Sequence, residues 1–348
     1  MSQGSRAGLE PATPRPHEAL RIVALGGGTG LSTLLEGLKG READAPLSDL
    51  TAIVTVTDEG GSSGRLRRDF SVLPPGDIRN CIVALAADKN LLSKLFQYRF
   101  GSGRGLKGHS FGNLFLTALT RVTGDFQQAV QVSSEVLAIR GKILPSTMTD
   151  VRLEAELADG ATVAGETNIS RARSRIRSIR LAPRHCQPVA EALEAIETAD
   201  LISLGPGSLY TSVVPHLLVH GVAKAIARSR AVKVYVCNLM QQPGETVGYT
   251  AGDHVRAILE HSGGHWGRAL LDYVVVNSRK VPAAMARRYA RQRCGPVEVD
   301  LETLAELGVQ VIAENLLAGG TVVRHQPARV AQLLVSLARL GRQQRAMA

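Results

Sequence analysis

The stretch RIVALGGGTGLSTLLEGLKG, residues 21–40, decides the fold of this chain. An apolar run ends in glycines, and an apolar pattern with helical spacing follows at once. This order predicts a strand that runs directly into a helix. Bare backbone at such a junction lets N–H groups and the positive end of the helix dipole approach an anion. The stretch therefore predicts a phosphate site around residues 27–30, and a tight turn without a ligand is the alternative that stays open.

The glycine motif differs from two common nucleotide-binding loops. It lacks the lysine of the P-loop, and Leu31 stands where GxGxxG requires its third glycine. The loop alone therefore indicates an anion without indicating which nucleotide carries it.

Further along the chain, short β-branched runs alternate with helical patterns. The runs cover 21–25, 51–56, 201–204, 232–236 and 273–276, and the helical patterns cover 31–39, 111–121, 188–198, 252–261 and 327–340. Nearly continuous apolar strands separated by helices are typical of a parallel sheet covered on both faces. We predict an α/β fold: a Rossmann-like, doubly wound, mostly parallel sheet.

Two segments interrupt this alternation. Residues 77–140 predict a helical insertion, and residues 142–181 predict a small antiparallel β region with a hairpin turn at Asp159-Gly160. We expect a single domain over 20–342. Residues 1–19 are polar and rich in Pro, Gly and Ala, which predicts a disordered leader without an export signal.

Composition narrows the class of protein further. The 348 residues are 44% hydrophobic, and no apolar run approaches the ~18 residues of a membrane span. The four cysteines are far apart and form no CxxC motif, so we expect reduced, mostly buried thiols and a cytoplasmic protein.

Arginine contributes much of the net charge of +10. Six arginines fall within RARSRIRSIRLAPR, and in an extended strand Arg171, Arg173, Arg175 and Arg177 would project from one face. Such a face suits phosphate or nucleic acid, or it is simply a solvated surface. No aromatic residue interleaves with these arginines, so the partners for base stacking are lacking and we expect no nucleic-acid ligand.

Polar residues follow the second predicted strand. Asp58 and Glu59 would lie at its carboxyl end, beside the first glycine loop. Acids at that position can hold a ribose, a Mg²⁺ ion or a hydroxyl proton, or they can cap the loop. The small residues of 60–64 and the cation Arg65 follow them, and this combination favours a phosphate-bearing ligand.

Two later motifs resemble this arrangement. GHSFGN at 108–113 places His109 at a helix start, where a capping or buried role is the expectation, and LGPGSLYTSVVP at 204–215 repeats the order strand, glycine, helix. The pairs His216/His220 and His261/His265 have the spacing of metal ligands without an acidic third ligand, so we expect packed side chains there.

Taken together, six motifs closely resemble the putative gluconeogenesis factor (YvcK-like) family. They are ALGGGTGLSTLLEGLK, AIVTVTDEGGSSGRLR, LPPGDIRNC, GHSFGNLF, LGPGSLYTS and VYVCNLMQQPGETVGYTAGDHV, and they occur in the family's order over roughly 21–340. The family belongs to the superfamily of 2-phospho-L-lactate transferase (CofD-like), a Rossmann-like enzyme that uses Mg²⁺.

The resemblance implies a cytoplasmic protein needed for gluconeogenic growth and for cell-shape control. It also implies binding of UDP-sugars such as UDP-N-acetylglucosamine, and a cell-wall synthesis partner and a homo-oligomer are further candidates. The ligand-binding residues that the motifs and the resemblance together indicate are Gly27, Gly28, Thr29, Gly30, Asp58, Gly60, Ser62, Ser63, His109, Asn113, Gly205, Gly207, Ser208, Asn238, Gln242, Tyr289 and Arg324.

An enzyme is the alternative function. A Mg²⁺-dependent transferase would move a phosphate-linked group from a nucleotide diphosphate donor to a hydroxyl. Asp58 would then be the base or a Mg²⁺ ligand, and Arg65 would neutralise developing charge. Glu59 stands where the transferase relatives more usually have aspartate.

Overall fold

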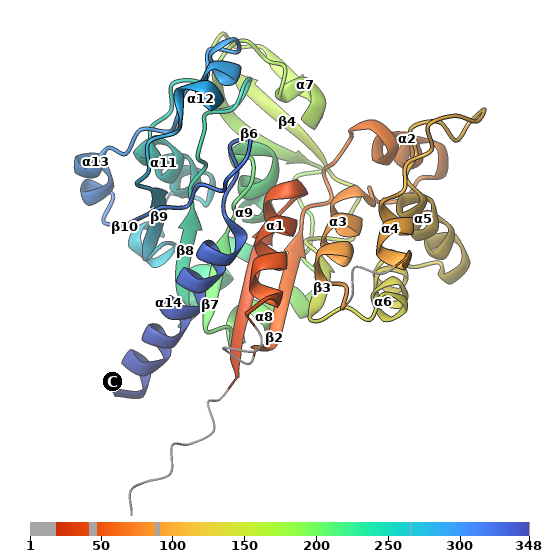
Figure 1. The fold of residues 1–348 in the computed structure, drawn as a ribbon, viewed down its shortest axis with the longest axis horizontal. Coiled ribbons are helices and arrows are strands. Elements are labelled where there is room, and N and C mark those ends of the chain that lie inside the picture. The colour runs from red at the N-terminus through yellow and green to blue at the C-terminus, as the bar shows by residue number, and fades with distance from the viewer. Residues whose placement is uncertain (1–18, 42–46, 88–90, 265, 348) are drawn as a thin grey trace, which may run out of the picture.

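The computed structural model describes residues 19–41, 47–87, 91–264 and 266–347. A seven-stranded sheet forms its centre, in the order β10-β9-β8-β7-β1-β2-β3 (Figure 1). Every neighbouring pair in this sheet is parallel. The strands are β1 (Leu20–Gly26), β2 (Leu47–Val54), β3 (Lys142–Pro145), β7 (Leu201–Leu204), β8 (Val232–Val236), β9 (Tyr273–Asn277) and β10 (Gln310–Glu314).

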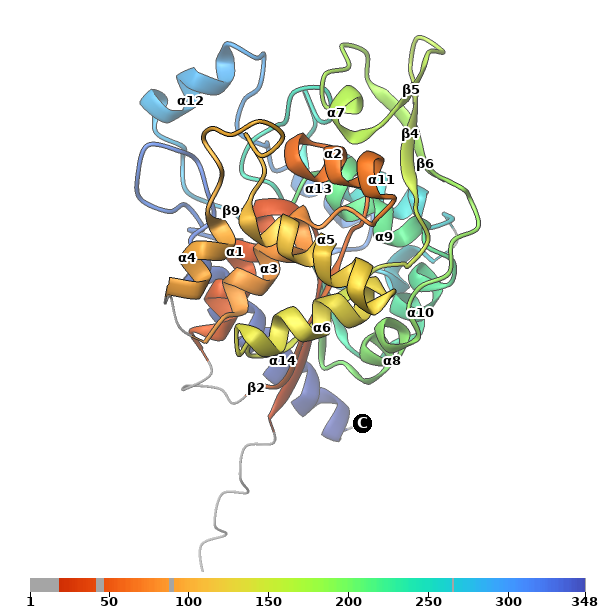
Figure 2. The same cartoon turned by 90° about the vertical axis from the view of Figure 1, so that its right-hand side faces the viewer.

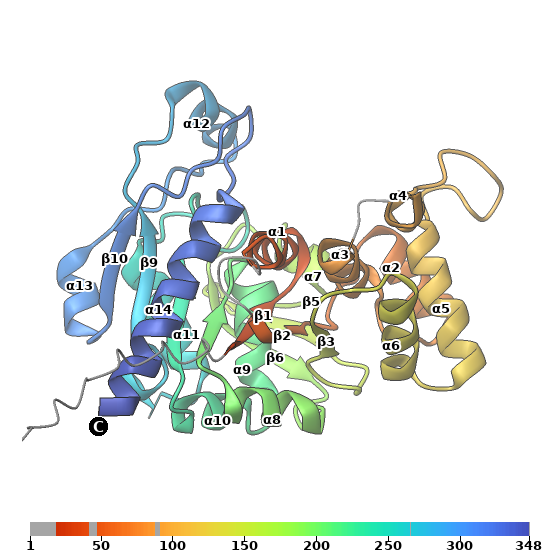
Figure 3. The same cartoon turned by 60° about the horizontal axis from the view of Figure 1, so that its bottom comes forward.

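Helices cover both faces of this sheet, as Figure 3 shows. On one face lie α1 (Gly28–Lys39), α3 (Gly76–Leu85) and α14 (Pro327–Met347), and on the other lie α8 (Ala190–Thr198), α9 (Val214–Leu218) and α10 (Val222–Arg228). The inner strands are apolar almost throughout because neither of their faces meets water. All four residues of β7 are buried, for example. The predicted doubly wound α/β fold is confirmed.

The strand order contains one reversal. From β1 the chain adds β2 and β3 on one side, and it then returns to add β7, β8, β9 and β10 on the other. In open sheets of this kind the ligand crevice lies outside the carboxyl ends of the strands at the reversal. The fold therefore predicts a ligand site at the loops that follow β1 and β7.

A second, antiparallel sheet has the order β5-β4-β6. Its strands are β4 (Arg152–Leu157), β5 (Thr162–Ala164) and β6 (Ile176–Ala182). The predicted hairpin is present, with Glu156 opposite Thr162 and with Gly160 at φ +83° in the turn. The small antiparallel β piece is therefore confirmed.

The expected arginine face is wrong for its first three members. The chain forms the short helix α7 (Glu166–Ile169) and a turn before β6 begins at Ile176, so Arg171, Arg173 and Arg175 precede the strand. Within β6, Arg177 pairs with Glu156 (3.1 Å) and Arg180 pairs with Glu154 (2.8 Å).

Helices dominate the segment between β2 and β3. They are α2 (Gly61–Phe70), α3, α4 (Leu91–Gln97), α5 (Phe111–Thr123) and α6 (Phe126–Val136), and Figure 2 shows α5 and α6 crossing the near side of the molecule. Side-chain caps fix the starts of the last two, because Ser110 accepts from Asn113 N and Asp125 accepts from Gln128 N. Strand β3, which lies within the β region predicted at 142–181, joins the main sheet beside β2 instead of the small sheet.

The predictions on the leader and on membrane spans can be compared only with the described residues. The leader expected over 1–19 lies outside the described residues except for Ala19. Among the helices of the described ranges, none has both the length and the apolar character that a membrane crossing requires.

A buried carboxylate ties the last helix to the sheet. Asp200 is only 3% exposed and precedes β7. It accepts a bond from Arg21 N (2.9 Å) and forms ion pairs with Arg342 and with Arg345 of α14, the latter at 2.9 Å. A single side chain thus joins β1, β7 and α14.

We predict that Asp200→Ala lowers the free energy of unfolding by about 2–4 kcal/mol, because the substitution leaves buried donors and two guanidinium groups without their acceptor. Glu197→Ala, at an exposed position of α8, is the control and should change it by less than about 0.5 kcal/mol. Denaturant unfolding measures both values. Equal effects of the two substitutions would contradict a role for Asp200 in holding α14.

Candidate functional site

A cavity of about 750 Å³ lies at the carboxyl ends of β1, β2, β7 and β8. Its walls are the loops after these strands, together with α7, α12 (Ala283–Ala290) and the segment that precedes α14. Its size falls in the range typical of small-molecule sites. Of the residues singled out by the sequence analysis, eleven line it: Gly27, Gly28, Thr29, Gly30, Asp58, Gly207, Ser208, Asn238, Gln242, Tyr289 and Arg324.

The first wall is the glycine loop after β1. Gly28 has φ +60°, a value that favours glycine, and α1 starts at this residue. Gly27 is surrounded closely, because a Cβ there would stand 2.8 Å from the Asp77 carboxylate. The amino end of α1 therefore faces the cavity with its backbone bare, which is the geometry of an anion site.

The second wall is the loop after β7. Gly205 has φ +73°, and Gly207 and Ser208 line the cavity before the π-helix η1 (Leu209–Val213) begins. The two loops touch, because a Cβ at Gly30 would stand 2.8 Å from the carbonyl carbon of Pro206. Gly205 itself does not line the cavity. Its backbone conformation shapes the loop that does.

Four carboxylates form the floor: Asp58, Asp77, Glu166 and Glu245. Asp58 Oδ1 accepts a bond from Gly60 N at 2.7 Å. Asp77, in the first turn of α3, lies beside the backbone N–H of Gly28 and the hydroxyl of Thr55, and both lower its pKa. The sequence analysis identified only Asp58, and the other three acids reach the same place from α3, from α7 and from the segment after β8.

Burial raises the pKa values of three of these acids, Asp77, Glu166 and Glu245. Burial and then the charge of Asp58 raise the pKa of Asp77 to about 7. Burial, followed by Asp58 and Asp77, raises the pKa of Glu166 to about 8. Burial also raises the pKa of Glu245 to about 7. The floor therefore holds protons at neutral pH, and it can donate hydrogen bonds to a ligand or bind a cation.

Glu245 also has a structural task. It is 4% exposed and accepts bonds from Tyr210 N (3.1 Å), from the Thr211 hydroxyl (3.2 Å) and from the Ser170 hydroxyl (3.4 Å). These bonds connect η1 to the segment after α7. The position of the second loop thus depends on a carboxylate in the cavity floor.

A chain of amides lies at the carboxyl end of β8. Asn238 Nδ2 donates to Gln242 Oε1 (3.0 Å), and Gln242 Nε2 donates to the Ser208 hydroxyl (2.9 Å). Asn238 Oδ1 is buried and has no hydrogen-bond partner among the described residues. The chain of bonds fixes which atom of Asn238 is the free acceptor, so the site can recognise a donor such as a base N–H.

The rim of the cavity brings together residues far apart in sequence. Tyr289 of α12 is half-buried and Arg324 is exposed, and both line the cavity. Beside Arg324, His325 Nε2 lies 3.1 Å from the carbonyl of Cys237. Burial lowers the pKa of His325 to about 4, so its ring is neutral and donates to that carbonyl.

Besides Gly205, six predicted residues do not line the cavity: Gly60, Ser62, Ser63, Arg65, His109 and Asn113. The Ser62 hydroxyl lies 2.9 Å from His109 Nδ1, and Asn113 Nδ2 donates to the Ser63 hydroxyl at 3.4 Å. These contacts fasten α2 to the start of α5. Arg65 donates to the carbonyl of Lys107 at 2.9 Å. Glu59 pairs with Arg67 (3.7 Å) and Arg152 (3.6 Å), outside the cavity lining.

Of the paired histidines in the sequence analysis, His216 and His261 are packed side chains. The expectation is wrong for His220, which follows the end of α9 and is exposed. Buried His216 lies with Nε2 at 3.0 Å from the carbonyl of Gly26, beneath the first loop. His261 accepts a bond from Ile179 N at 3.1 Å. Its expected neighbour His265 lies outside the described residues.

No group of three or more His, Cys, Asp or Glu side chains within the described ranges is arranged to hold a metal ion. Asp58 and Asp77 nevertheless interact closely enough for Asp58 to raise the pKa of Asp77. Mg²⁺ is commonly held by one or two carboxylates together with ligand phosphates, and this pair beside an anion loop fits that mode. The Mg²⁺ role of Asp58 stays a prediction.

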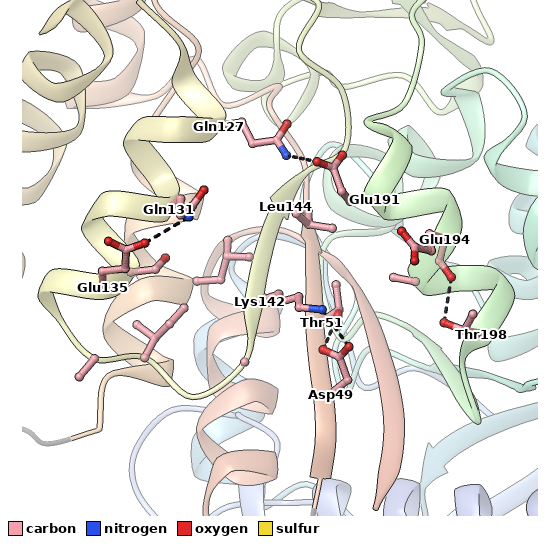
Figure 4. Close-up of a pocket in the computed structure, with 16 residues that line it drawn as sticks. Asp49, Thr51, Gln127, Gln131, Glu135, Lys142, Leu144, Glu191, Glu194 and Thr198 are labelled. Carbon is pink, nitrogen blue, oxygen red and sulfur yellow. Dashed lines mark hydrogen bonds and ion pairs between the residues drawn. The ribbon is translucent and has the colours of Figure 1, made fainter. Parts of the chain in front are cut away.

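A second cavity, of about 520 Å³, lies between α6 and α8 over β2 and β3 (Figure 4). Gln127 Nε2 donates to Glu191 across it at 2.8 Å, and Lys142 pairs with Asp49 at 3.0 Å. It lies toward the amino ends of the strands, and its lining includes neither glycine loop. We therefore place the candidate site in the larger cavity.

Comparison with known proteins gives the family of this chain. Residues 22–317 match the family model described as 2-phospho-L-lactate transferase CofD. The chain is 46% identical over 318 residues to the gluconeogenesis factor of Bacillus subtilis, covering 91% of this chain and 98% of that protein. It is 52% identical over 323 residues to a putative gluconeogenesis factor of Nostoc sp., and the match covers 92% of this chain and 69% of that protein.

This chain belongs to the gluconeogenesis factor family. A crystal structure of protein BH3568 from Bacillus halodurans has a TM-score of 0.87 and 45% identity, covering 91% of this chain and all of that one. The family that the six motifs indicated is therefore confirmed, as is the fold class predicted from the alternation of strands and helices. In this member of the gluconeogenesis factor family, Asp77 of the motif PPGDIRNC lies in the cavity floor.

The carboxylate floor predicts how stability depends on pH. Glu166 holds its proton in the folded protein up to about pH 8, whereas its usual pKa is 4.5. Unfolding releases that proton in this window, so the free energy of unfolding should fall as the pH rises from about 4.5 to 8. Glu166→Gln should flatten the fall, and Glu197→Gln should not. A profile of Glu166→Gln parallel to the wild type in denaturant unfolding at several pH values would contradict the raised pKa.

Proposed function

We propose that the protein is a cytoplasmic regulator that binds a UDP-sugar, such as UDP-N-acetylglucosamine, in the larger cavity. The observation that carries this proposal is the contact between two glycine loops at the reversal of the sheet. Gly30 packs against the Pro206 carbonyl, and Gly27 and Gly207 line the same space. In open parallel sheets this is where nucleotide phosphates bind.

The diphosphate would lie at the amino end of α1. Backbone N–H groups of the first loop and the hydroxyl of Ser208 are the donors available there. The positive end of the helix dipole would offset part of the charge of the phosphates. The acids of the floor would then face the sugar, whose hydroxyls can donate to carboxylates and accept from protonated ones.

The base would lie between the amide chain and the rim. Asn238 Oδ1 needs a donor, and uracil supplies one at its ring N–H. Tyr289 offers an aromatic face for stacking, and Arg324 offers a cation near the phosphates or the ribose. This arrangement supports a nucleotide with a donor on its base edge, as uridine has.

The family supports a proposal about the wider role. Relatives of this chain are named gluconeogenesis factors, and we propose that the protein is needed for growth on gluconeogenic carbon and for cell shape. In this role ligand occupancy would report the supply of a cell-wall precursor to a partner in cell-wall synthesis. A homo-oligomer is compatible with this proposal.

A transferase is the second candidate, and the carboxylate floor favours it. Asp58 and Asp77 would hold Mg²⁺, which when bound supplies positive charge to the phosphates of the donor. Glu166, with its raised pKa, could accept or return a proton at an acceptor hydroxyl. Arg65 does not line the cavity, so the charge-neutralising role expected of it has no support here.

UDP-N-acetylglucosamine should stabilise the protein against heat. At 100 times its dissociation constant a ligand adds about 2.7 kcal/mol, which raises the melting temperature by roughly 2–4 °C for a chain of this size. GDP and a short DNA duplex should not. Thermal denaturation with each ligand, with and without Mg²⁺, measures this. A shift with GDP and Mg²⁺ alone would contradict the regulator and favour the transferase.

Asn238→Ala should weaken UDP-N-acetylglucosamine binding about three- to tenfold, because it removes an acceptor that the base would use. Asn315→Ala is a matched control, since Asn315 Oδ1 is also buried without a partner among the described residues but lies outside the cavity lining. Calorimetric titration gives both constants. Equal weakening by the two substitutions would place the base elsewhere.

Incubation with UDP-N-acetylglucosamine and Mg²⁺ separates the two functions. The regulator should leave the nucleotide sugar unchanged over hours, as followed by chromatography. Rapid consumption that Asp58→Asn abolishes, and that Asp159→Asn in the β4–β5 hairpin leaves intact, would show the transferase instead. The structure offers Asp159 as a control because it lies in the turn of the small sheet, away from the cavity.

A further inference from the structure

The segment 91–108, made up of α4 and the loop that leads to α5, carries an exposed apolar patch. On α4, Leu91 is 80% exposed, and Leu92 and Leu95 are also exposed. In the loop, Tyr98 and Leu106 are exposed as well. Soluble proteins rarely gather several large exposed apolar residues in one short stretch unless the surface binds something.

The apolar residues of α4 lie on one side of the helix. Leu91 and Leu95 are four residues apart and therefore neighbours on its surface, and Leu92 is three residues from Leu95. The opposite side holds Ser93 and Phe96, which are buried. Phe96 packs against Phe111 and Phe115 of α5, with ring centroids 6.0 and 5.0 Å apart. The leucines thus face outward because the core holds the other side of the helix.

The loop is held at its base and open at its tip. Gly108 N donates to the carbonyl of Phe100 (2.8 Å), and Phe100 N donates to the carbonyl of His109 (2.9 Å). Arg99 Nη1 adds a bond to the carbonyl of Gly108 at 2.6 Å. Figures 1 and 3 show this loop projecting from the end of the molecule opposite α13 (Leu301–Glu306). The patch is therefore a protrusion on a firm base.

The charge of the segment is of one sign. Between residues 91 and 108 there is no aspartate or glutamate, and the basic residues are Lys94, Arg99, Arg104 and Lys107. All four side chains are exposed. A surface that combines apolar residues with cations and lacks acids complements an anionic, apolar partner.

We propose that segment 91–108 binds an anionic lipid surface. Leucine side chains would enter the interface between headgroups and acyl chains, and the four cations would contact lipid phosphates. A protruding loop suits a planar, deformable surface better than it suits the groove of a protein, which accepts an apolar helix into a concave site. A second copy of the chain joined through the same patch would bring four cations against four.

Vesicle co-sedimentation of the full chain tests this proposal. The vesicles contain one part phosphatidylglycerol to two parts phosphatidylcholine, and pure phosphatidylcholine vesicles serve as the neutral comparison. The protein should bind the anionic vesicles at low salt, bind the neutral ones far less, and lose affinity as salt screens the charges. Absence of binding to the anionic vesicles at low salt would overturn the proposal.

Variants separate apolar insertion from charge attraction. Leu91→Ser with Leu95→Ser should weaken binding about tenfold or more, since buried apolar area is lost. Arg104→Ser with Lys107→Ser should weaken it about 30-fold, from roughly 1 kcal/mol per cation. Val122→Ser, at an apolar position 83% exposed on α5, and Arg171→Ser with Arg173→Ser are the controls and should bind as the wild type does. A leucine variant that binds like the wild type would overturn insertion.

Hydrogen exchange of the unmodified protein gives a second measurement that does not depend on variants. Anionic vesicles should slow exchange of amides in 91–108 and leave α8 unchanged. If an acidic amphipathic peptide protects this segment while vesicles do not, the partner is a protein and the lipid proposal fails. Self-association that protects the segment without vesicles would also overturn it.

Discussion

Two backbone segments meet at the carboxyl ends of β1 and β7 so closely that no side chain fits between them. A Cβ on Gly30 would stand 2.8 Å from the carbonyl carbon of Pro206, and a Cβ on Gly27 would press on Asp77. This contact exists because β1 and β7 are neighbours in the sheet although they begin far apart in sequence, at Leu20 and at Leu201. The cavity, the orientation of α1 and the amide chain on Ser208 are all arranged around this contact.

Burial of the carboxylates in the cavity floor costs free energy of folding, and this cost indicates that they have a function. Burial raises the pKa of Asp77, Glu166 and Glu245. A core with only a structural role would contain apolar side chains instead, because burying carboxylates costs free energy. Sites where burial and like charges shift several pKa values commonly bind or transform a ligand. Glu245 also holds η1 through Tyr210 N, so the chemistry of the floor and the position of the second loop are linked.

Local patterns predicted the parts of this structure that local chemistry decides. The first glycine loop, the hairpin at Asp159-Gly160 and five apolar strands of the main sheet (β1, β2, β7, β8 and β9) follow from adjacent residues. Strand β3 was predicted as part of the small β region because its neighbours in sequence belong there, although it pairs with β2. Strand β10 was missed because it is polar at both ends. The sequence analysis missed Asp77 and Glu166 as site residues, because only the folded chain brings the starts of α3 and α7 close to Asp58. The prediction of an arginine face was wrong because α7 and a turn precede β6, and strand periodicity does not reveal where a strand begins.

The central claim is that the two glycine loops hold the phosphates of one nucleotide sugar. Hydrogen exchange of backbone amides, with and without UDP-N-acetylglucosamine, tests it most directly because these amides are the proposed donors. We expect the ligand to slow exchange in 26–31 and 205–209 together, and to leave the α6–α8 cavity unchanged. Protection confined to the α6–α8 cavity, or to one loop alone, would contradict the account.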